Sequence, residues 1–230
     1  MFPSFIYGNK DSYENFGIII NKLPPSVVPE NNIEEYELPG RDGNLTIDYK
    51  TRKSYILPLE CTIMDKTRIE EVKAWLMNTS SDLVFSWDPN YKYQARIINK
   101  IDISQSLKTF GEFPLMFKVQ PYKLSINNDE VITLEDTGTI YNGTGNISRP
   151  IIKVFCTGAI TLMVNGLSVV LTNVVDYVTI NSDLQDAYKD TLLKNNDMSG
   201  EFPTLEVGNN TISWTGTVTK VEITPNWRWI

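Results

Sequence analysis

The pattern that most restricts the fold of this chain is an Asn-Gly step between two alternating apolar runs. Residues 160–164 and 167–171 flank Asn165 and Gly166. A two-residue type I′ turn needs positive φ at both central positions, which Asn and Gly adopt at low cost. The pattern therefore predicts an antiparallel β-hairpin. Similar runs of β-branched and aromatic residues, punctuated by Asn, Gly, Asp and Thr, fill most of the sequence, so we expect a mainly β protein.

Three further elements follow from local patterns. Residues 211–214 and 218–223 flank Thr215-Gly216-Thr217 and predict a second hairpin near the C-terminus. Residues 67–78 predict a helix, with Thr67 as N-cap and Glu70 completing a capping box. Residues 183–196 predict a second, short helix. The first helix has one core-facing apolar stripe, formed by Ile69, Val72, Trp75 and Leu76.

A polar, turn-rich stretch at residues 125–150 divides the chain into two domains. The helix, most prolines and most aromatic residues precede it, and short, regularly punctuated strands follow it. We therefore expect an α+β domain with one clear helix at residues 1–130, followed by an all-β sandwich at residues 131–230. The last strand, within residues 218–230, can pack back onto the first domain.

Composition excludes several classes of function. The 230 residues include no histidine, which removes Ser-His-Asp and Cys-His catalysis and His-ligated zinc. With 21 basic and 28 acidic side chains, the net charge is −7 and the pI is about 4.8. A surface that binds the phosphate backbone of DNA tightly needs clustered Lys and Arg side chains. Tight DNA binding is therefore not expected. An acidic channel can still surround DNA without holding it.

Cysteines and apolar segments indicate a protein made soluble in the cytoplasm. Cys61 and Cys156 lie 95 residues apart in strand-like runs, which favours two buried side chains, although a single disulfide stays open. The N-terminus lacks the basic and apolar regions of a signal peptide. The most apolar stretch, residues 159–175, is interrupted by polar residues and is not typical of a membrane span.

No set of residues predicts a catalytic, cofactor or metal site. Residues 183–197 lack the ligand alternation of a calcium loop, and no glycine-rich phosphate loop follows a strand. Residues 31–37 are acidic, which is typical of a solvated face, although such a run can also line an acidic lumen or meet a basic neighbour. The candidate carboxylate pairs are drawn from Glu34, Glu35, Glu37, Asp183, Asp186 and Asp190. None lies in a pattern that would raise one pKa, so we expect no enzyme.

Five tryptophans leave a second class of function open. Most tryptophans in a domain of this size are core or interface anchors. Trp227 and Trp229 lie in the last four residues, where a frayed tail seldom carries such side chains, and we expect a docked strand or a subunit contact. Exposed tryptophans of the second domain, such as Trp214, could alternatively form a carbohydrate-binding surface used in adhesion.

Motifs spread over nearly the whole chain resemble the distal tail proteins of long-tailed bacteriophages and related prophage tail particles. No single motif is specific, but their order and spacing together are. They are Pro39-Gly40-Arg41-Asp42-Gly43, the predicted helix at 67–78, Val119-Gln120-Pro121-Tyr122, Tyr141-Asn142-Gly143-Thr144, Arg149-Pro150-Ile151-Ile152, the Asn165-Gly166 hairpin, Tyr188, residues 200–205, Gly208-Asn209-Asn210 and the Trp-rich C-terminus.

The resemblance implies a baseplate hub at the tip of the virion tail, assembled in the host bacterial cytoplasm. In that family an α+β N-terminal domain forms a homohexameric ring, and a galectin-like β-sandwich projects from it. The ring joins the tail-tube protein to the tail-associated tip protein, often anchors receptor-binding proteins, and lets DNA pass without specific binding. This chain is too short for an inserted carbohydrate-binding module. Galectin-type sugar sites need a histidine, so we expect the fold without that site.

We therefore expect a structural tail protein with no cofactor, no metal and no membrane contact. Ring closure requires two different patches on each subunit to meet. The residues that we expect at contacts between neighbouring subunits are Gly40, Arg41, Asp42, Gly43, Trp227 and Trp229. The alternatives are a carbohydrate-binding adhesion module without a hub role, and a carboxylate-based glycosidase.

Overall fold

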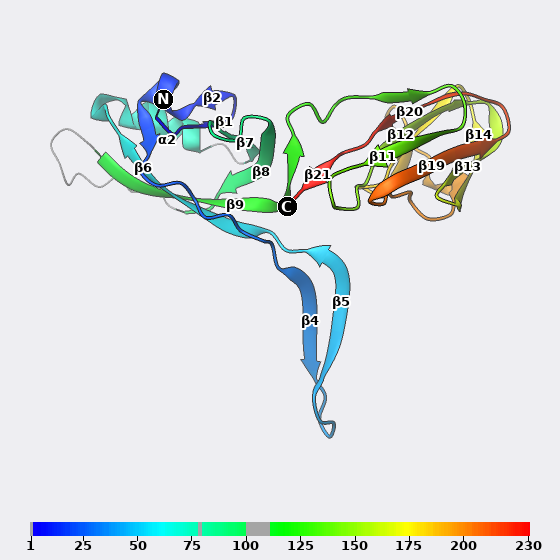
Figure 1. The fold of residues 1–230 in the computed structure, drawn as a ribbon, viewed down its shortest axis with the longest axis horizontal. Helices are drawn as coiled ribbons and strands as arrows, with labels where there is room; N and C mark the ends of the chain where they lie inside the picture. The colour runs from blue at the N-terminus through cyan, green and yellow to red at the C-terminus, as the bar shows by residue number, and fades with distance from the viewer. Residues whose placement is uncertain (1, 78–79, 100–110) are drawn as a thin grey trace. The chain divides into compact units, whose positions relative to one another are not determined.

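The computed structural model describes residues 2–77, 80–99 and 111–230, and the fold is mainly β (Figure 1). The described chain divides into two compact units, Met1–Ile126 with Ile230, and Asn127–Trp229. The division falls between residues 126 and 127, where the sequence suggested 130 and 131. No described helix is long and apolar enough to cross a membrane.

The first unit is built on an antiparallel sheet. Its strands follow the order β2-β1-β7-β8-β9-β6-β3. The longest strand, β9, buries alternate side chains from Gly111 to Val119, which gives the sheet one core-facing side. The bounds are β1 Phe5–Tyr7, β2 Lys10–Asp11, β3 Ile18–Ile20, β6 Tyr55–Ile63, β7 Ser81–Phe85, β8 Tyr91–Ile97 and β9 Gly111–Ser125.

Two short helices lie in this unit. The first, α1 (Ser12–Phe16), was not predicted from the sequence. Its cap residue Asp11 accepts hydrogen bonds from the Tyr13 and Glu14 amides, and Gly17 ends the helix at φ 64°. The helix α2 (Ile69–Leu76) confirms the helix predicted from the apolar stripe. Trp75 is buried there, and its indole donates a 2.7 Å hydrogen bond to the Tyr7 carbonyl.

The predicted capping box at the start of that helix is wrong. Thr67 lies inside a 3-10 turn, η1 (Lys66–Arg68), and the N-cap position is Arg68, which makes no side-chain cap bond. Instead the Asp65 carboxylate accepts from the Thr67 amide at 2.9 Å and from its hydroxyl at 2.7 Å. The Thr67 hydroxyl therefore donates to Asp65, two residues upstream, and does not cap the helix. The predicted end at residues 78–79 lies outside the described residues.

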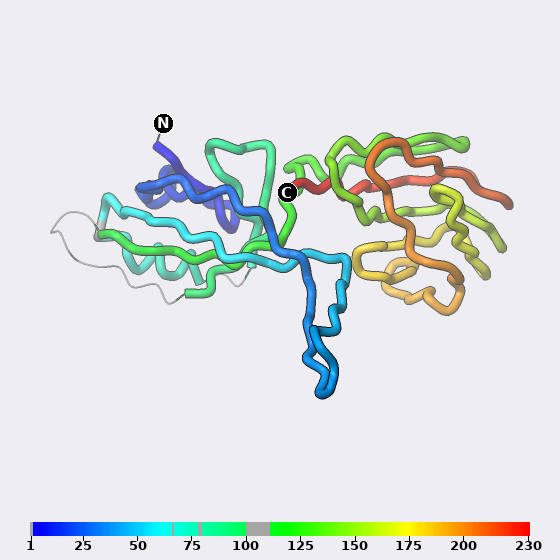
Figure 2. Tube along the Cα trace, turned by 60° about the horizontal axis from the view of Figure 1, so that its bottom comes forward, coloured from blue at the N-terminus to red at the C-terminus, as the bar shows by residue number. Residues whose placement is uncertain are grey.

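A long hairpin extends from the first unit. Among the described strands, β4 (Asn31–Glu37) and β5 (Asn44–Arg52) pair only with each other. Figures 1 and 2 show this two-stranded sheet standing away from the helices and the main sheet of its own unit.

The second unit is a β-sandwich. One sheet has the order β10-β20-β12-β15-β16-β17 and the other β11-β19-β13-β14-β18, and apolar side chains from both fill one core. The bounds are β10 Ile132–Leu134, β11 Gly138–Asn142, β12 Ile151–Cys156, β13 Gly158–Val164, β14 Leu167–Val174, β15 Tyr177–Asn181, β16 Asp186–Lys189, β17 Leu192–Leu193, η2 Asn195–Asp197, β18 Met198–Ser199, β19 Gly208–Thr215, β20 Val218–Thr224 and β21 Arg228–Trp229.

The Asn165-Gly166 hairpin is confirmed. Strands β13 and β14 pair across it, and φ is 52° at Asn165 and 82° at Gly166. The prediction of a C-terminal hairpin is wrong, although both of its strands, β19 and β20, are present. β19 belongs to one sheet and β20 to the other, so Gly216 lies in a connection that crosses the sandwich instead of a hairpin turn.

The second predicted helix is also wrong. Residues 183–196 contain the strands β16 and β17. The Asn181 side chain accepts from the Asp183 and Leu184 amides at 3.1 Å each, which forms a turn where the helix was expected to begin. Gln185 and Asp190 have positive φ, which interrupts any helical run.

Candidate assembly surface

The register of the β4–β5 hairpin sorts its side chains onto two faces of opposite character. Glu34 lies opposite Ile47, and Tyr36 lies opposite Leu45. Directly paired residues and residues two apart on a strand share a face. One face, here called the apolar face, therefore carries Tyr36, Leu45, Ile47 and Tyr49 around the Glu34 carboxylate.

The apolar face is open to solvent in the single chain. Tyr36 and Tyr49 are each 47% exposed, Leu45 is 41% exposed and Ile47 is 39% exposed. A two-stranded hairpin is marginally stable in water unless its apolar side packs against something. Contiguous exposed apolar side chains mark interaction sites. This face is thus a candidate surface for contact with another protein.

Glu34 links the two strands of the hairpin on the apolar face. Its carboxylate accepts hydrogen bonds from the Tyr36 hydroxyl and, at 3.0 Å, from the Tyr49 hydroxyl. These two bonds, that from Tyr36 first, lower the pKa of Glu34, because they favour its ionised form. The same carboxylate raises the pKa of both phenols. A lowered pKa suits a structural acceptor and not a general acid.

The opposite face of the hairpin is acidic. Glu35 lies opposite Thr46 and Glu37 opposite Asn44, with Asp48 further along β5. Asn44 donates a 3.0 Å hydrogen bond to Glu35. This acidic face carries three carboxylates, of which Asp48 lies 2.7 Å from the Lys50 ammonium, so its net charge is negative.

The predicted contact residues lie in two different units. Gly40, Arg41, Asp42 and Gly43 all belong to the exposed loop at the hairpin tip, where Gly40 and Gly43 have φ of 84° and 79°. The Arg41 amide donates a 3.2 Å hydrogen bond to the Leu38 carbonyl. The other two predicted residues, Trp227 and Trp229, belong to the second unit.

The two C-terminal tryptophans are half-buried. Trp227 packs against the core of the sandwich. The apolar face itself was missed at the sequence level. Its signal was present in the alternation Leu45-Thr46-Ile47-Asp48-Tyr49, which is typical of a strand with one apolar side.

The acidic groupings considered as catalytic pairs lie on exposed surface. Glu34, Glu35 and Glu37 occupy the hairpin, with alternate residues on opposite faces. Asp186 accepts a 3.1 Å hydrogen bond from Asn195, and Asp190 accepts one from the Tyr177 hydroxyl. Among the described residues, no three or more Cys, Asp or Glu side chains gather as a metal site.

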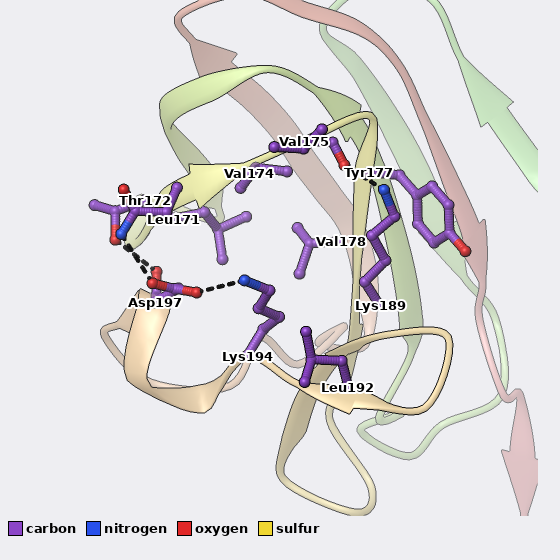
Figure 3. A pocket seen from close by; sticks show the side chains of 11 residues that line it. Leu171, Thr172, Val174, Val175, Tyr177, Val178, Lys189, Leu192, Lys194 and Asp197 are labelled. Carbon is purple, nitrogen blue, oxygen red and sulfur yellow. Dashed lines mark hydrogen bonds and ion pairs between the residues drawn. The ribbon is translucent and has the colours of Figure 1, made fainter.

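A cavity of about 220 Å³ opens at one side of the sandwich (Figure 3). Leu171, Val174 and Val178 form its buried apolar floor. At its rim the Lys194 ammonium lies 2.9 Å from Asp197, and Asn173 donates a 3.0 Å hydrogen bond to the same carboxylate. Hydrogen bonds from Asn173 and then Lys194 lower the pKa of Asp197. The charged groups are therefore paired with each other, and the cavity offers an apolar surface without a reactive group.

Comparisons with known proteins support the architecture. No protein-family model matches the chain, and no curated protein matches it. Among solved structures, the chain is similar to the crystal structure of SPP1 Dit (gp 19.1), described as a paradigm of the hub adsorption apparatus in phages that infect Gram-positive bacteria. The TM-score is 0.71 at 15% identity, and the alignment covers 100% of both chains. The chain therefore has the fold of SPP1 Dit over its full length.

Proposed function

We propose that this chain is a distal tail protein, a structural component of the tail tip of a bacteriophage or of a prophage-derived tail particle. The observation that carries the proposal is the match to SPP1 Dit, a hub protein, across both units. Fold alone does not determine function. The exposed apolar face of the hairpin supplies the independent support, because a structural hub needs such a surface and a monomeric protein does not.

The proposed assembly is a homohexameric ring. A closed ring uses one patch of each subunit against a different patch of the next. The apolar face (Tyr36, Leu45, Ile47 and Tyr49) would be covered by the neighbouring subunit, and the tip loop with Arg41 would lie at the edge of that contact. The acidic face would stay in solvent. An acidic lining suits a channel through which DNA passes without specific binding.

The proposed partners are those of a tail hub. They are the tail-tube protein on one side, the tail-associated tip protein on the other, and receptor-binding proteins around the ring. The role is structural and uses no cofactor. In this proposal the chain is made in the cytoplasm of the host bacterium and ends in the virion tail.

The native mass of the purified full-length chain tests the ring. Six copies of 26.2 kDa give about 157 kDa, and two stacked rings give twice that mass. Either value, with six-fold rings in negative-stain images, is expected. The second readout is antibody labelling of tail particles from the source bacterium. A chain that is monomeric and also absent from tail tips would contradict the hub role.

The alternative of a carbohydrate-binding module in the second unit has less support. Trp214 is half-buried and packs against the core of the sandwich. A stacking platform for a sugar needs one open aromatic face. We therefore retain the hub as the proposed function.

A further inference from the structure

The first unit contains a hollow of about 220 Å³ that the proposed hub role does not use. It lies where the core-facing side of the sheet continues beyond the packed core. In β9 the alternating buried side chains end at Val119, and the next residues on that side, Pro121 and Lys123, line the hollow. All of its lining residues belong to this unit, and segment 24–27 forms part of its wall. The hollow is therefore a feature of one subunit.

Aromatic side chains form one wall of this hollow. Trp87 follows β7 and is 40% exposed, and its ring stacks on Phe85 at 4.5 Å between centroids. The Tyr93 ring meets Phe85 edge-on at 5.7 Å. Phe85 is buried, so it supports the indole from behind. Phe85 therefore backs one side of the Trp87 indole, and the exposed part of the ring is available for stacking at the hollow.

Polar groups surround the aromatic wall. The Lys123 ammonium lies 3.0 Å from the Asp88 carboxylate and 4.2 Å from the centre of the Tyr91 ring. Burial alone would lower the pKa of Lys123, but the hydrogen bond to Asp88 and the nearby phenols outweigh it and raise that pKa. Lys123 therefore stays charged at neutral pH. The pair gives the hollow one donor group and one acceptor group, with no net charge.

Two phenol hydroxyls complete the polar set. Tyr55 and Tyr93 line the hollow, and within the described part of the chain nothing hydrogen-bonds to either hydroxyl. Burial, together with the neighbouring Tyr93, raises the pKa of Tyr55 to about 12, and burial also raises the pKa of Tyr93. Both groups stay protonated, so each can donate and accept. A partly buried hydroxyl without a protein partner favours a ligand or water in the hollow.

We propose that this hollow binds one unit of a neutral saccharide, with a sugar face stacked on Trp87 and sugar hydroxyls bonded to Tyr55, Tyr93 and the Asp88–Lys123 pair. A sugar ring combines an apolar C–H face with hydroxyls that both donate and accept, and the hollow offers the complement of each. Its volume is about 220 Å³. That space suits a single ring and not a long chain.

Other ligand chemistries fit less well. An anion such as phosphate would meet the Asp88 carboxylate beside the one ammonium group. A proline-rich peptide favours an aromatic groove, but it would leave the two phenols and the ion pair without matched partners. The site is also distinct from any galectin-type sugar site, because it lies in the first unit. The inference is independent of the hub role, since it concerns one subunit.

Saturation-transfer NMR on the full-length protein tests the proposal. The probes are the methyl glycosides of glucose, galactose, rhamnose, N-acetylglucosamine and N-acetylgalactosamine. A single buried sugar ring gives few contacts, so a dissociation constant on the order of 1 mM is expected for the best of them. Trp87→Ala should weaken that binding by at least about tenfold.

A conservative variant keeps the test decisive if Trp87→Ala destabilises the fold. Tyr55→Phe with Tyr93→Phe preserves both rings and removes only the hydroxyls, and it should also weaken binding by about tenfold. The matched control is Tyr141→Phe, which removes a hydroxyl from an exposed tyrosine of the second unit. No binding by any glycoside at tens of millimolar, binding equal in wild type and the double variant, or binding only of a polyproline peptide would each overturn the proposal.

Discussion

The Tyr49 hydroxyl of β5 donates a 3.0 Å hydrogen bond across the hairpin to the Glu34 carboxylate of β4. The Tyr36 hydroxyl donates to the same oxygen. The Tyr49–Glu34 bond therefore connects the two strands on the face that carries the exposed apolar side chains, and the Tyr36 bond holds the same carboxylate from within β4. If a neighbouring subunit covers the apolar face as proposed, this link orders that face in advance and lowers the entropy lost on assembly.

Acidification should loosen this link. The two hydrogen bonds need the ionised form of Glu34 and hold its pKa below the usual 4.5. A carboxyl group with a lowered folded pKa contributes stability above its unfolded pKa and loses it as the pH falls through the folded pKa. We expect the Tyr49 ring signals in NMR spectra to shift on titration below about pH 4.5. In Glu34→Gln this titration should be absent, and its persistence there would assign it to another group.

Removing the apolar face should weaken assembly of the proposed ring and leave the fold intact. In Leu45→Ser with Ile47→Ser, each lost side chain removes about 2 kcal/mol of interface burial. The subunit concentration needed for assembly should rise more than about 100-fold. Native mass spectrometry measures this shift. The matched control is Asn44→Ser with Thr46→Ser, which alters alternate positions of the same strand on the acidic face. Equal loss of rings in both variants would contradict a face-specific contact.

Charge at the tip of the hairpin should also affect assembly, more weakly. Arg41 lies in an exposed loop, and Arg41→Glu reverses its charge. If the loop meets a neighbouring subunit, the concentration at half assembly should rise by about tenfold, with a strong dependence on salt. Arg41→Lys keeps the charge and should assemble normally. A charge-reversed variant with wild-type assembly would remove this loop from the contact.

The sequence predicts those elements whose geometry is decided locally. Asn165 and Gly166 specify their hairpin because both adopt positive φ within two residues. The Thr215-Gly216-Thr217 step fits a hairpin turn equally well, but the turn joins two different sheets. That choice depends on strands β12 and β13, which are distant in sequence, and it could not be made from local pattern.

Competing side-chain hydrogen bonds explain the errors in helix prediction. The Thr67 hydroxyl donates to Asp65 in place of the expected capping box. The Asn181 side chain forms a turn at the start of the predicted second helix. For the assembly surface, Gly40 and Gly43 of the tip loop predicted a hairpin at this position. The apolar face needed the register of β4 against β5, because a shift of one residue would place Ile47 on the other side.

The crossing connection at Gly216 should be intolerant of a side chain. Gly216 has φ of 99°, and a Cβ there would lie 2.9 Å from the Ala159 carbonyl oxygen and 2.9 Å from Ile160. Gly216→Ala should lower the free energy of unfolding by more than the roughly 1–2 kcal/mol of left-handed strain. Gly158 has φ of 87° with open space where a Cβ would lie, so Gly158→Ala measures the backbone strain without the steric clash. Denaturant unfolding measures both, and equal losses would contradict the contact.

The two thiols should report separately on the two units. Cys61 lies in the core of the first unit and Cys156 in that of the second, and both are buried and unpaired. Burial raises the pKa of Cys61 to about 12 and that of Cys156 to about 11, so neither forms a reactive thiolate at pH 8. Native protein should therefore resist Ellman's reagent, and denatured protein should react at both thiols. In Cys61→Ala the reactivity of the remaining thiol, Cys156, reports the opening of the sandwich. In Cys156→Ala the reactivity of Cys61 reports the opening of the first unit. Labelling of either variant within seconds under native conditions would contradict burial of that thiol.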